Sequence, residues 1–457
     1  MRPLSTVFAL AWLGGFQALP VNAIQTISAI GSKFFYEDGT QYFLKGIAYQ
    51  LIPDDPLVDT AQCKRDFALM TELGTNAIRV YHVDPKADHD GCMEALAAAG
   101  IYLFVDLDTF DTSINQDKPQ WTHSQFERYK AVLDEFQKYN NTAGVFVGNE
   151  VINTGEGSAA APYVLAAAHD IKSYRNEKGY RNIPVGYSAA DIAELRPMLQ
   201  NYLACRPDSA DRLDFFSLNA YEWCGHSSYE TSGYKRLQSQ ASDYPIPIFF
   251  SETGCNAARP RTFEDQAAIF GPEMSNTWSG SMIYEWIQEA NDYGLIKYGP
   301  PSGASPAKML VQDGFTRQGE PIPVDPDFHN LKAQWARLRP TGVALSDYIK
   351  STSSIKPASC PTSTPGGWAV DSHQPLPTLQ RATSDVAAAG PNPGFGSGPD
   401  SGSRPEHLSA RVTSVAPSDY HSSRAVNGAS AGTRGFDRLA GGSLFLCMLI
   451  SALALWL

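Results

Sequence analysis

The sequence has few charged residues, and fewer basic than acidic ones. Charged residues make up 18% of its 457 residues, and 36 Lys and Arg stand against 48 Asp and Glu, a net charge of −12. No stretch gathers Lys and Arg into a cluster, whereas a protein that binds nucleic acid needs a basic face to neutralise phosphates. We therefore expect no nucleic acid among its partners. With 43% hydrophobic residues, the chain can build a large core, which excludes a wholly disordered protein.

Cysteine is also scarce, and its spacing excludes the usual zinc sites. The seven cysteines contain no C-x-x-C pair, and no H-x-x-x-H spacing accompanies them. The run GEGSAA at 155–160 resembles a dinucleotide fingerprint, but it lies mid-chain and the next strand lacks the acid that would bind a ribose. We expect neither a metal nor a cofactor. Cys447 lies in an apolar tail, and the other six suit disulfides in an oxidising compartment, although their number leaves the pairing open.

The start of the chain has the pattern of a secretory signal. Arg2 gives a basic start, residues 7–19 are apolar but too few to cross a bilayer, and the small residues Val21 and Ala23 suit a cleavage site. This pattern predicts a signal peptide over residues 1–23. The alternative is an N-terminal core helix.

The end of the chain has the pattern of a glycosylphosphatidylinositol (GPI) anchor signal. Residues 444–457 are apolar to the last residue, and a polar spacer and a cluster of small residues precede them. Asn427, Gly428 and Ser430 all fit the attachment site, and we expect residues 431–457 to be removed as the propeptide. A tail-anchored transmembrane helix is the alternative, but the stretch is short for a span. We expect an extracellular protein, anchored to the outer leaflet of the plasma membrane or passed into the cell wall.

A tether and a stalk are expected between the folded part and the anchor, over residues 346–430. After Cys360 the chain is rich in Ser, Pro, Gly, Ala and Thr, contains no Lys, and shows no aliphatic periodicity. Such a segment buries too little apolar surface to offset its ordering entropy, so we expect a disordered, O-glycosylated stalk. A single sequon offers Asn140 for N-glycosylation.

Residues 24–345 alternate short apolar runs with helical stretches. Continuous apolar runs are typical of parallel strands that are buried on both faces. One helix is expected from Thr122 to Asn140, and Gly74 and Gly100 suit helix C-caps. Eight strand-then-helix units over this length predict a (β/α)8 TIM barrel, and a doubly wound open sheet is the alternative. The predicted strands are 42–49, 76–82, 102–107, 144–151, 184–188, 215–221, 247–252 and 281–286.

Polar side chains stand at the ends of these runs, where a barrel of this kind carries its active site. Glu150 ends the fourth run and Glu252 the seventh. Burial at the barrel mouth would raise the pKa of one carboxyl, as a general acid requires, while the second attacks an anomeric carbon. A separation of about 5–5.5 Å would give a retaining glycosidase. The alternative is that both glutamates pair with a cation such as Arg79 as a structural ion pair.

The fuller motifs carry a family resemblance over residues 24–345. The strings KGIAYQ, NAIRVYHVDP, GVFVGNEV, IPVGYSAAD, NAYEWCG, FFSETGCN and EANDYGL together resemble the fungal cell-wall β-1,3-glucanosyltransferases, glycoside hydrolase family 72. The resemblance implies an enzyme that cleaves β-1,3-glucan internally, holds the donor as an ester on Glu252 with Glu150 as acid/base, and transfers it to the non-reducing end of a second glucan.

The same resemblance implies further residues. It assigns substrate binding to Gln50, Tyr81, Asp106, Asn149, Tyr221 and Tyr284. It implies the disulfides Cys63–Cys92, Cys205–Cys360 and Cys224–Cys255. The chain departs from some family members because no cysteine-rich carbohydrate-binding domain follows the barrel.

Aromatic residues near the strand ends are candidate sugar platforms, since sugar C–H faces stack on rings. These are Tyr221, Trp223, Tyr284, Trp286 and Tyr293. Two other functions remain open. A retaining endo-β-1,3-glucanase shares the chemistry up to the ester and differs in using water as the acceptor. A non-catalytic wall-binding protein would need neither glutamate.

Overall fold

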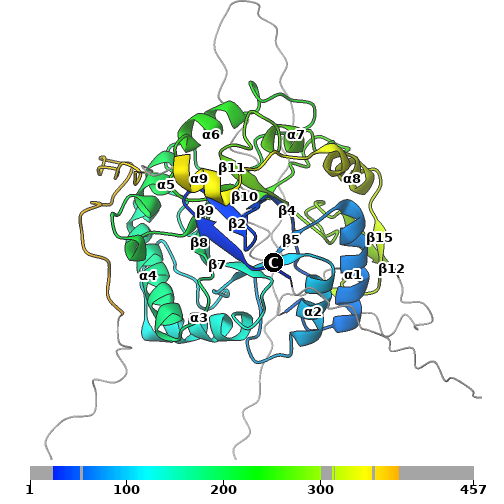
Figure 1. The fold of residues 1–457 in the computed structure, drawn as a ribbon, viewed down its shortest axis with the longest axis horizontal. Coiled ribbons are helices and arrows are strands. Elements are labelled where there is room, and N and C mark those ends of the chain that lie inside the picture. The colour runs from blue at the N-terminus through cyan, green and yellow to red at the C-terminus, as the bar shows by residue number, and fades with distance from the viewer. Residues whose placement is uncertain (1–23, 52–54, 300–310, 313, 352–355, 380–457) are drawn as a thin grey trace, which may run out of the picture. The chain divides into compact units, whose positions relative to one another are not determined.

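Eight parallel strands in the computed structural model close into a barrel, around which Figure 1 shows a ring of helices. The structure describes residues 24–51, 55–299, 311–312, 314–351 and 356–379. The predicted (β/α)8 barrel is confirmed, and the open sheet is wrong because β11 pairs with β4 and closes the ring. The strands are β4 (Leu44–Ala48), β5 (Ala77–Val80), β6 (Tyr102–Asp106), β7 (Thr142–Asn149), β8 (Val185–Ala190), β9 (Phe215–Asn219), β10 (Ile248–Thr253) and β11 (Trp278–Ile283).

The barrel strands are buried on both faces, as their apolar runs predict. Every residue of β5, β6, β9, β10 and β11 is buried. Their outward side chains pack against the helices, and their inward side chains fill the barrel. A continuous apolar run therefore marks each strand, and each predicted run overlaps one of the eight.

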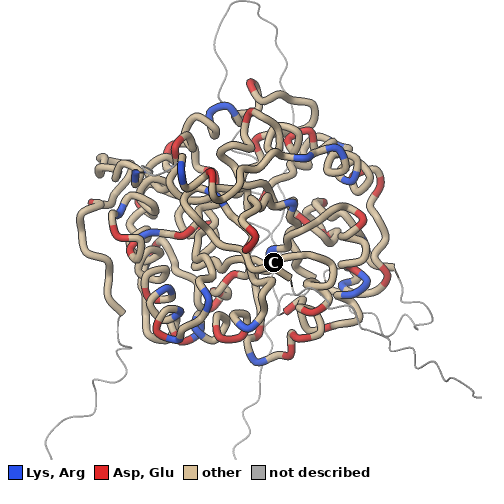
Figure 2. The backbone as a smooth tube through the Cα atoms, viewed as in Figure 1, with Lys and Arg blue, Asp and Glu red and all other residues tan. Residues whose placement is uncertain are grey.

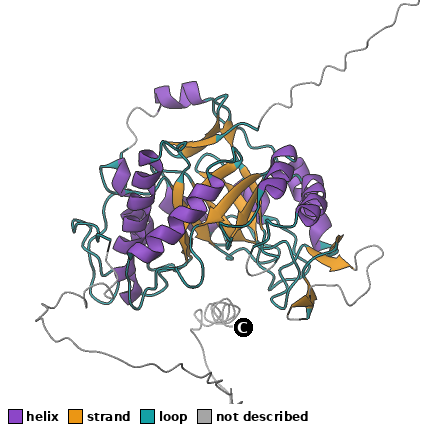
Figure 3. Ribbon diagram, turned by 90° about the horizontal axis from the view of Figure 1, so that it is seen from below, coloured by secondary structure: helices purple, strands orange, loops and turns teal. Residues whose placement is uncertain are grey.

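Helices cover the barrel on its outer side, as Figure 3 shows from the side. They are α1 (Thr60–Leu73), α2 (Asp90–Ala98), α3 (His123–Phe136), α4 (Ala161–Glu177), α5 (Arg196–Ala204), α6 (Tyr234–Ala241), α7 (Asp265–Ile269) and α8 (Asp327–Arg337). The helix α1 ends at Gly74, which adopts the left-handed conformation with a φ of 83°. A short 3-10 helix, η1 (Glu156–Ala160), precedes α4, and η2 (Ser209–Asp211) follows α5.

The helix α3 is shorter than predicted. Thr122 and Gln125 form a capping box at its start, but it ends at Phe136 rather than Asn140. The hydroxyl of Thr142 donates to the carbonyl of Phe136 at 2.8 Å. This side chain satisfies a carbonyl at the helix end, and the chain turns into β7. Asn140 is therefore exposed in the turn between α3 and β7.

The N-terminal end of the barrel is closed. A small antiparallel sheet of β1 (Ile27–Ile30), β2 (Lys33–Tyr36) and β3 (Gln41–Tyr42) lies across it, as Figure 3 shows. Phe34 on β2 enters the barrel, with ring centroids 6.1, 6.0 and 6.1 Å from those of Phe104, Phe215 and Phe249. Gly186 leaves room for this cluster, because a Cβ there would lie 2.3 Å from the ring of Phe215. A ligand would therefore approach the barrel from its C-terminal end.

The connection after β11 forms further small elements before α8. The strand β12 (Ile296–Gly299) pairs with β15 (Glu320–Pro323), and β13 (Val311–Gln312) pairs with β14 (Phe315–Thr316). After α8, the short helix α9 (Leu345–Ser351) packs on the N-terminal sheet, where Tyr348 accepts a hydrogen bond from the backbone of Ser32 at 2.7 Å.

The chain remains ordered beyond Cys360, which differs from the predicted start of the stalk. Trp368 is fully buried, with its ring centroid 5.4 Å from that of Tyr202 on α5. The backbone of Ala369 donates to Ser158 on η1 at 2.8 Å. The prediction rested on the average composition of a long segment, in which a single tryptophan has little weight. Trp368 and the Cys205–Cys360 disulfide attach this part of the chain to the barrel domain. We call residues 356–379 the C-terminal strap.

Charges are spread over the barrel. In Figure 2 basic and acidic residues are mixed around the outer helices, without a region occupied by Lys and Arg alone. In the described part of the chain, no helix has both the length and the apolar character that crossing a membrane requires. The predicted signal peptide, Asn427, Gly428, Ser430 and residues 431–457 lie outside the described residues.

Candidate active site

A buried arginine joins the ends of five barrel strands. Arg79 on β5 is 0% exposed and donates to Asp106 on β6 through Nε at 3.0 Å and Nη2 at 2.7 Å. Its Nη2 also donates to Asn149 on β7 at 3.0 Å, and its Nη1 donates to Ser188 on β8 at 3.0 Å. The same Nη1 lies 3.5 Å from Glu252 on β10. One guanidinium therefore positions side chains on four other strands, β6, β7, β8 and β10.

Glu252 has the partners that a carboxylate needs. Tyr81 donates to its Oε1 and Tyr221 to its Oε2, both at 2.8 Å. The pKa of Glu252 is raised to about 7, because burial and the charge of Glu150 raise it more than Arg79 and the two tyrosines lower it. Near neutral pH the negative charge on this side chain thus has a cation and two hydroxyl donors to stabilise it.

Glu150 lies in a different environment. Its Oε1 accepts a hydrogen bond from the neutral amide of Asn219 at 2.9 Å. Burial raises its pKa, and the Asn219 bond and the charge of Arg79 only partly oppose this. Its backbone has a φ of 48°, in the left-handed region that non-glycine residues rarely adopt and that clusters at active sites. The two glutamates interact electrostatically, and their close partners differ, since Glu150 has a neutral amide whereas Glu252 has two hydroxyls and a nearby cation.

The orientation of Asn149 follows from its partners. Arg79 can only donate hydrogen bonds, so the side-chain atom that faces it at 3.0 Å is the amide oxygen. The same oxygen accepts from Asn219 at 3.1 Å. The NH2 of Asn149 is therefore the donor left for a ligand beside Glu150. Asn219 is held in turn by Ser188 and Ser251, whose hydroxyls donate to its Oδ1 at 2.9 and 2.8 Å.

Gln50 and Tyr284 meet on the other side of Glu252. Gln50 donates to the hydroxyl of Tyr284 at 2.8 Å and to Glu285 at 2.5 Å, and Asn291 donates to Glu285 at 2.7 Å. Burial raises the pKa of Glu285 to about 7. Glu285 is thus a third buried acid, and it interacts electrostatically with Glu252. Because it accepts hydrogen bonds from Gln50 and Asn291, it positions Gln50 and the loop that carries Asn291.

Three tyrosines form an aromatic wall at this mouth. Tyr293 lies 5.6 Å from Tyr221 and 5.3 Å from Tyr284 between ring centroids, and all three are partly exposed. Trp286 is not a platform, in contrast to the sequence-based expectation, because it is fully buried and donates to Tyr298 at 3.2 Å. Trp223 packs edge-on against the buried Tyr234, 5.2 Å away.

The ion-pair alternative holds only in part. The nearest carboxylate of Arg79 is Asp106, at 2.7 Å, whereas Glu252 lies at 3.5 Å. The close contact of Glu150 is Asn219. In a purely structural ion pair, Arg79 would neutralise both glutamates. Here Glu252 lies near Arg79 and Glu150 is hydrogen-bonded to Asn219, so the two glutamates have unequal environments.

Several site residues were not singled out from the sequence. Asn219 and Ser188 stand at or near strand ends within the quoted motifs, but nothing in their residue types marks them. Arg79 was expected only as the cation of a possible structural ion pair, although a lone charge inside the apolar run NAIRVYH at an inward position needs a buried partner. Tyr81, Asp106, Asn149, Tyr221, Gln50 and Tyr284 all lie in the network as described above.

The six cysteines form the pairs that the family resemblance implies. Cys63 pairs with Cys92, Cys205 with Cys360, and Cys224 with Cys255. The last pair is adjacent to the site, because each of its cysteines lies three residues after Tyr221 or Glu252. It ties the loops after β9 and β10 together. In the described ranges no three His, Cys, Asp or Glu side chains converge as a metal site would require.

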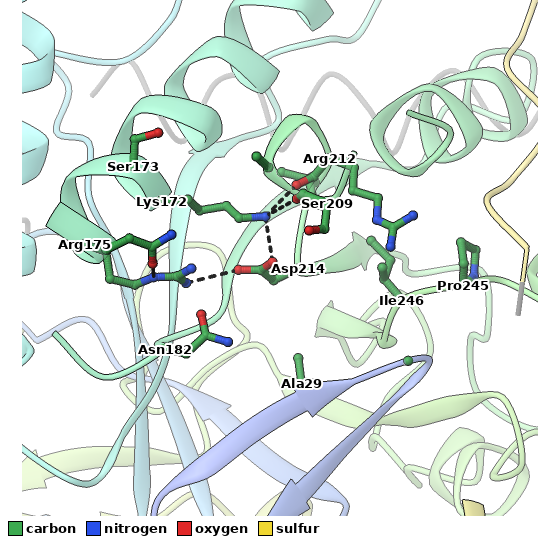
Figure 4. A pocket seen from close by; sticks show the side chains of 14 residues that line it. Ala29, Lys172, Ser173, Arg175, Asn182, Ser209, Arg212, Asp214, Pro245 and Ile246 are labelled. Carbon is green, nitrogen blue, oxygen red and sulfur yellow. Dashed lines mark hydrogen bonds and ion pairs between the residues drawn. The ribbon is translucent and has the colours of Figure 1, made fainter. Parts of the chain in front are cut away.

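A cavity of about 420 Å³ lies at the other end of the barrel. Figure 4 shows Lys172 and Arg175 of α4 pointing to Asp214, with Lys172 at 2.7 Å and Arg175 at 3.3 Å from its carboxylate oxygens. Lys172 also donates to the carbonyls of Ser209 and Arg212. These residues lie on α4 and in the segment before β9, near Ala29 of β1, at the N-terminal end of the barrel, where enzymes of this fold do not carry their active sites. The network stabilises the fold.

The arrangement at the C-terminal mouth suits displacement at an anomeric carbon. A carboxylate held by a cation and two hydroxyls, a second buried carboxyl, an oriented amide and an aromatic wall meet at the C-terminal ends of the strands. These are the parts of a two-carboxylate glycosidase.

Comparisons with known proteins show which proteins this chain is similar to. A family model described as Glucanosyltransferase matches residues 17–306. Protein EPD1 of Candida maltosa is 41% identical over 371 residues, covering 79% of this chain and 63% of its own length. The 1,3-beta-glucanosyltransferase GAS2 of Saccharomyces cerevisiae is 38% identical over 382 residues, covering 79% of this chain and 65% of its own length. The chain thus spans slightly less than two thirds of these relatives.

Solved structures are similar as well. The crystal structure of ScGas2 with a compound matches with a TM-score of 0.71 and 39% identity, over 80% of this chain and 79% of that one. A mutant of Saccharomyces cerevisiae Gas2p in complex with laminaritetraose and laminaripentaose matches with a TM-score of 0.68 and 39% identity, over 80% and 76% of the two chains.

Proposed function

Because the chain belongs to the glucanosyltransferases of glycoside hydrolase family 72, we propose that it is a retaining β-1,3-glucanosyltransferase. It cleaves β-1,3-glucan internally and transfers the donor to the non-reducing end of another β-1,3-glucan, which elongates wall glucan. The unequal environments of Glu150 and Glu252 carry the proposal, with a cation and two hydroxyls at one carboxyl and a neutral amide at the other. The relative solved with two laminari-oligosaccharides supports the substrate class.

In the first step the carboxylate of Glu252 attacks the anomeric carbon, and the bond from that carbon to the glycosidic oxygen breaks. Glu150 gives its proton to the departing oxygen, so the leaving chain departs as an alcohol and the donor remains as an α-linked ester on Glu252. Tyr81 and Tyr221, which hold the two oxygens of Glu252, keep the nucleophile in line for attack.

In the second step Glu150 is a carboxylate and acts as a base. It takes the proton from the 3-hydroxyl of an acceptor glucan, whose oxygen attacks the anomeric carbon while the ester bond to Glu252 breaks. Two displacements restore the β configuration. Asn149, whose NH2 is free to donate, binds the sugar hydroxyl beside the reacting carbon, and Asp106 positions Arg79 rather than touching the sugar.

Gln50 and Tyr284 complete the binding side of the cleft. Their mutual hydrogen bond presents one amide and one phenol beside Glu252, and the rings of Tyr221, Tyr284 and Tyr293 offer apolar faces for sugar C–H groups. A site lined by such rings also holds less free water, which favours a sugar hydroxyl over water as the acceptor.

The product test separates transfer from hydrolysis. The protein is incubated with reduced laminari-oligosaccharides, and products are sized by mass spectrometry. Products longer than the substrate support the transferase. Shorter products alone would replace it with an endo-β-1,3-glucanase, and unchanged substrate would favour a non-catalytic wall-binding protein.

Site variants test the assignment of the two glutamates. Glu150→Gln and Glu252→Gln should each lose activity by about 10³-fold or more while the fold is retained. Glu230→Gln serves as the control, because Glu230 is a surface glutamate paired with Lys235. Activity retained in either site variant would contradict the assignment.

We also propose that a GPI anchor holds the mature protein at the outer face of the plasma membrane, with a signal peptide removed at the other end. The apolar C-terminal residues and the preceding small residues support this. Phosphatidylinositol-specific phospholipase C should release the protein from cells, and a chain that ends at Ser430 should be secreted. Retention after the phospholipase would favour a transmembrane tail or a wall linkage.

Asn140 is proposed to carry an N-glycan. It is exposed in the turn after α3, so a glycan there would extend into solvent without disturbing the barrel. Treatment with an N-glycosidase should lower the apparent mass of the secreted protein, and Asn140→Gln should abolish that change.

A further inference from the structure

We propose that Asp66 on α1 is a positioning residue that sets how the ester on Glu252 is divided between transfer and hydrolysis. Asp66 accepts hydrogen bonds from Tyr49 and Tyr298, which belong to two segments that line the cleft. It is 0% exposed, so it acts through these side chains and not on the sugar. The proposal rests on the proposed function, because it concerns the step that resolves the ester.

The carboxylate of Asp66 joins two tyrosines from distant parts of the chain. Its Oδ2 accepts from the hydroxyl of Tyr49, which follows β4, and from the hydroxyl of Tyr298 on β12, both at 2.8 Å. Gln62, one turn earlier on α1, donates to Oδ1 at 3.0 Å. The pKa of Asp66 is raised to about 6, because burial raises it more than the hydrogen bonds from these side chains lower it. At neutral pH the acceptor is therefore ionised, and hydrogen bonds to a charged group are the stronger kind.

The bond to Tyr49 fixes the end of β4. Tyr49 is fully buried, and its ring centroid lies 5.6 Å from that of Phe67 on α1. Gln50 follows directly and donates to Tyr284 and Glu285 in the cleft. Because the two residues are adjacent, a movement of Tyr49 away from α1 would displace Gln50 from its partners.

The bond to Tyr298 fixes the loop between β11 and β12. The backbone of Ile296 donates to the carbonyl of Trp286 at 2.9 Å and closes this loop, and the indole of Trp286 donates to the hydroxyl of Tyr298 at 3.2 Å. Tyr293, which belongs to the aromatic wall, lies within the loop. Asp66 therefore holds the base of the loop two residues beyond its closing bond, on the side away from the cleft.

The placement of these segments bears on how the ester is resolved. Either the 3-hydroxyl of a glucan or a water molecule bonds through its oxygen to the anomeric carbon, gives its proton to Glu150 and releases Glu252 as a carboxylate. Water needs no binding surface for this step, whereas the glucan has to be held by side chains of the cleft in the geometry of attack. Displaced rings would also admit more water. Loosening the two segments therefore disfavours transfer more than hydrolysis.

The ratio of transfer to hydrolysis products tests the proposal. The full chain is incubated with reduced laminari-oligosaccharides, from which transfer forms longer reduced chains and hydrolysis forms chains with a free reducing end. Tyr49→Phe and Tyr298→Phe each remove one hydroxyl and keep the ring, and each should lower the ratio by about 3- to 10-fold. Both products arise from the same ester, so a smaller fraction of folded enzyme would leave the ratio unchanged.

A variant of the acid shows whether the tyrosines act through it. Asp66→Ala should lower the ratio at least as far as either tyrosine variant, and adding Tyr49→Phe to it should cause no further fall. A further fall of the same size would mean that Tyr49 acts independently of Asp66, which would overturn the proposal. If Asp66→Ala does not fold, Tyr49→Phe and Tyr298→Phe decide the matter by themselves.

Tyr244→Phe is the matched control. Tyr244 is also buried, and its hydroxyl donates to the carbonyl of Gln200 at 2.6 Å in the segment before β10, away from the mouth of the barrel. Like Tyr49→Phe, this variant should lower the urea midpoint of unfolding, but it should keep the product ratio of the parent. An equal fall of the ratio in the control would contradict a specific role for Asp66.

The outcomes separate this proposal from the proposed function. If the parent forms longer products and both tyrosine variants keep its ratio, Asp66 does not position the cleft for this step, and the transferase stands. If the parent forms no longer products, the transferase itself is wrong, and the role of Asp66 falls with it.

Discussion

Arg79 and Asp106 face each other in a bidentate pair, with Nε to Oδ1 at 3.0 Å and Nη2 to Oδ2 at 2.7 Å. Neither side chain is more than 3% exposed. Arg79 has further donors, which reach Asn149, Ser188 and Glu252. Asp106 therefore fixes the plane of the guanidinium, and the guanidinium fixes the groups that surround the reacting carbon.

We expect Arg79→Leu to be both inactive and unstable. Removing the cation leaves the buried Asp106 carboxyl without its partner, which costs about 3–5 kcal/mol of unfolding free energy. Loss of the donors around Glu252 should lower kcat by about 10²-fold or more. Arg79→Lys keeps the charge but not the planar guanidinium that donates to both oxygens of Asp106, so its losses of stability and activity should be smaller. Urea unfolding and transfer assays measure both effects.

The exposed Arg128 on α3 provides the matched control, since Arg128→Leu should change neither quantity appreciably. Full activity in Arg79→Leu would mean that the guanidinium does not organise the site.

A second prediction concerns pH. Burial raises the pKa of Glu252 to about 7, and the hydroxyl of Tyr221 is one of the groups that lower it. Attack needs the ionised form, so kcat/KM should fall as the pH drops through this pKa. Tyr221→Phe removes a donor to the carboxylate, which raises the pKa, so the acid limb of the profile should move to higher pH. The variant should therefore lose more activity at about pH 6 than at about pH 8.

Tyr229→Phe is a suitable control for that profile, because Tyr229 lies on the surface and is partly exposed. A Tyr221→Phe profile that is scaled down uniformly, with no displacement of its acid limb, would show that the hydroxyl acts on the sugar rather than on Glu252.

A third prediction concerns the C-terminal strap. Trp368→Ala should destabilise the protein by about 3–5 kcal/mol, because a fully buried tryptophan leaves a cavity. Since the strap bonds to Ser158 on η1, in the loop after Glu150, the variant should also lower kcat more than it changes KM. An unchanged urea midpoint would mean that the strap does not contribute to the fold.

The eight strands and both central glutamates could be predicted from the sequence. The barrel strands are buried on both faces, so each appears as a local apolar run, and the acids follow where those runs end. The role of Asn219 could not be predicted, because it depends on Asn149, Glu150, Ser188 and Ser251 meeting in space. The packing of the C-terminal strap could not be predicted for a similar reason. Trp368 is one apolar residue in a polar stretch, and its burial depends on Tyr202, far away in the sequence.

The assignment of Glu252 as nucleophile and Glu150 as acid/base is tested most directly by azide rescue. Each glutamate is replaced by alanine, an aryl β-laminarioside serves as donor, and the glycosyl azide is identified by NMR. With Glu252→Ala, azide attacks the sugar once and should give the α-azide. With Glu150→Ala, azide attacks the ester on Glu252 and should give the β-azide. The opposite anomers, or no rescue of either variant, would contradict the account.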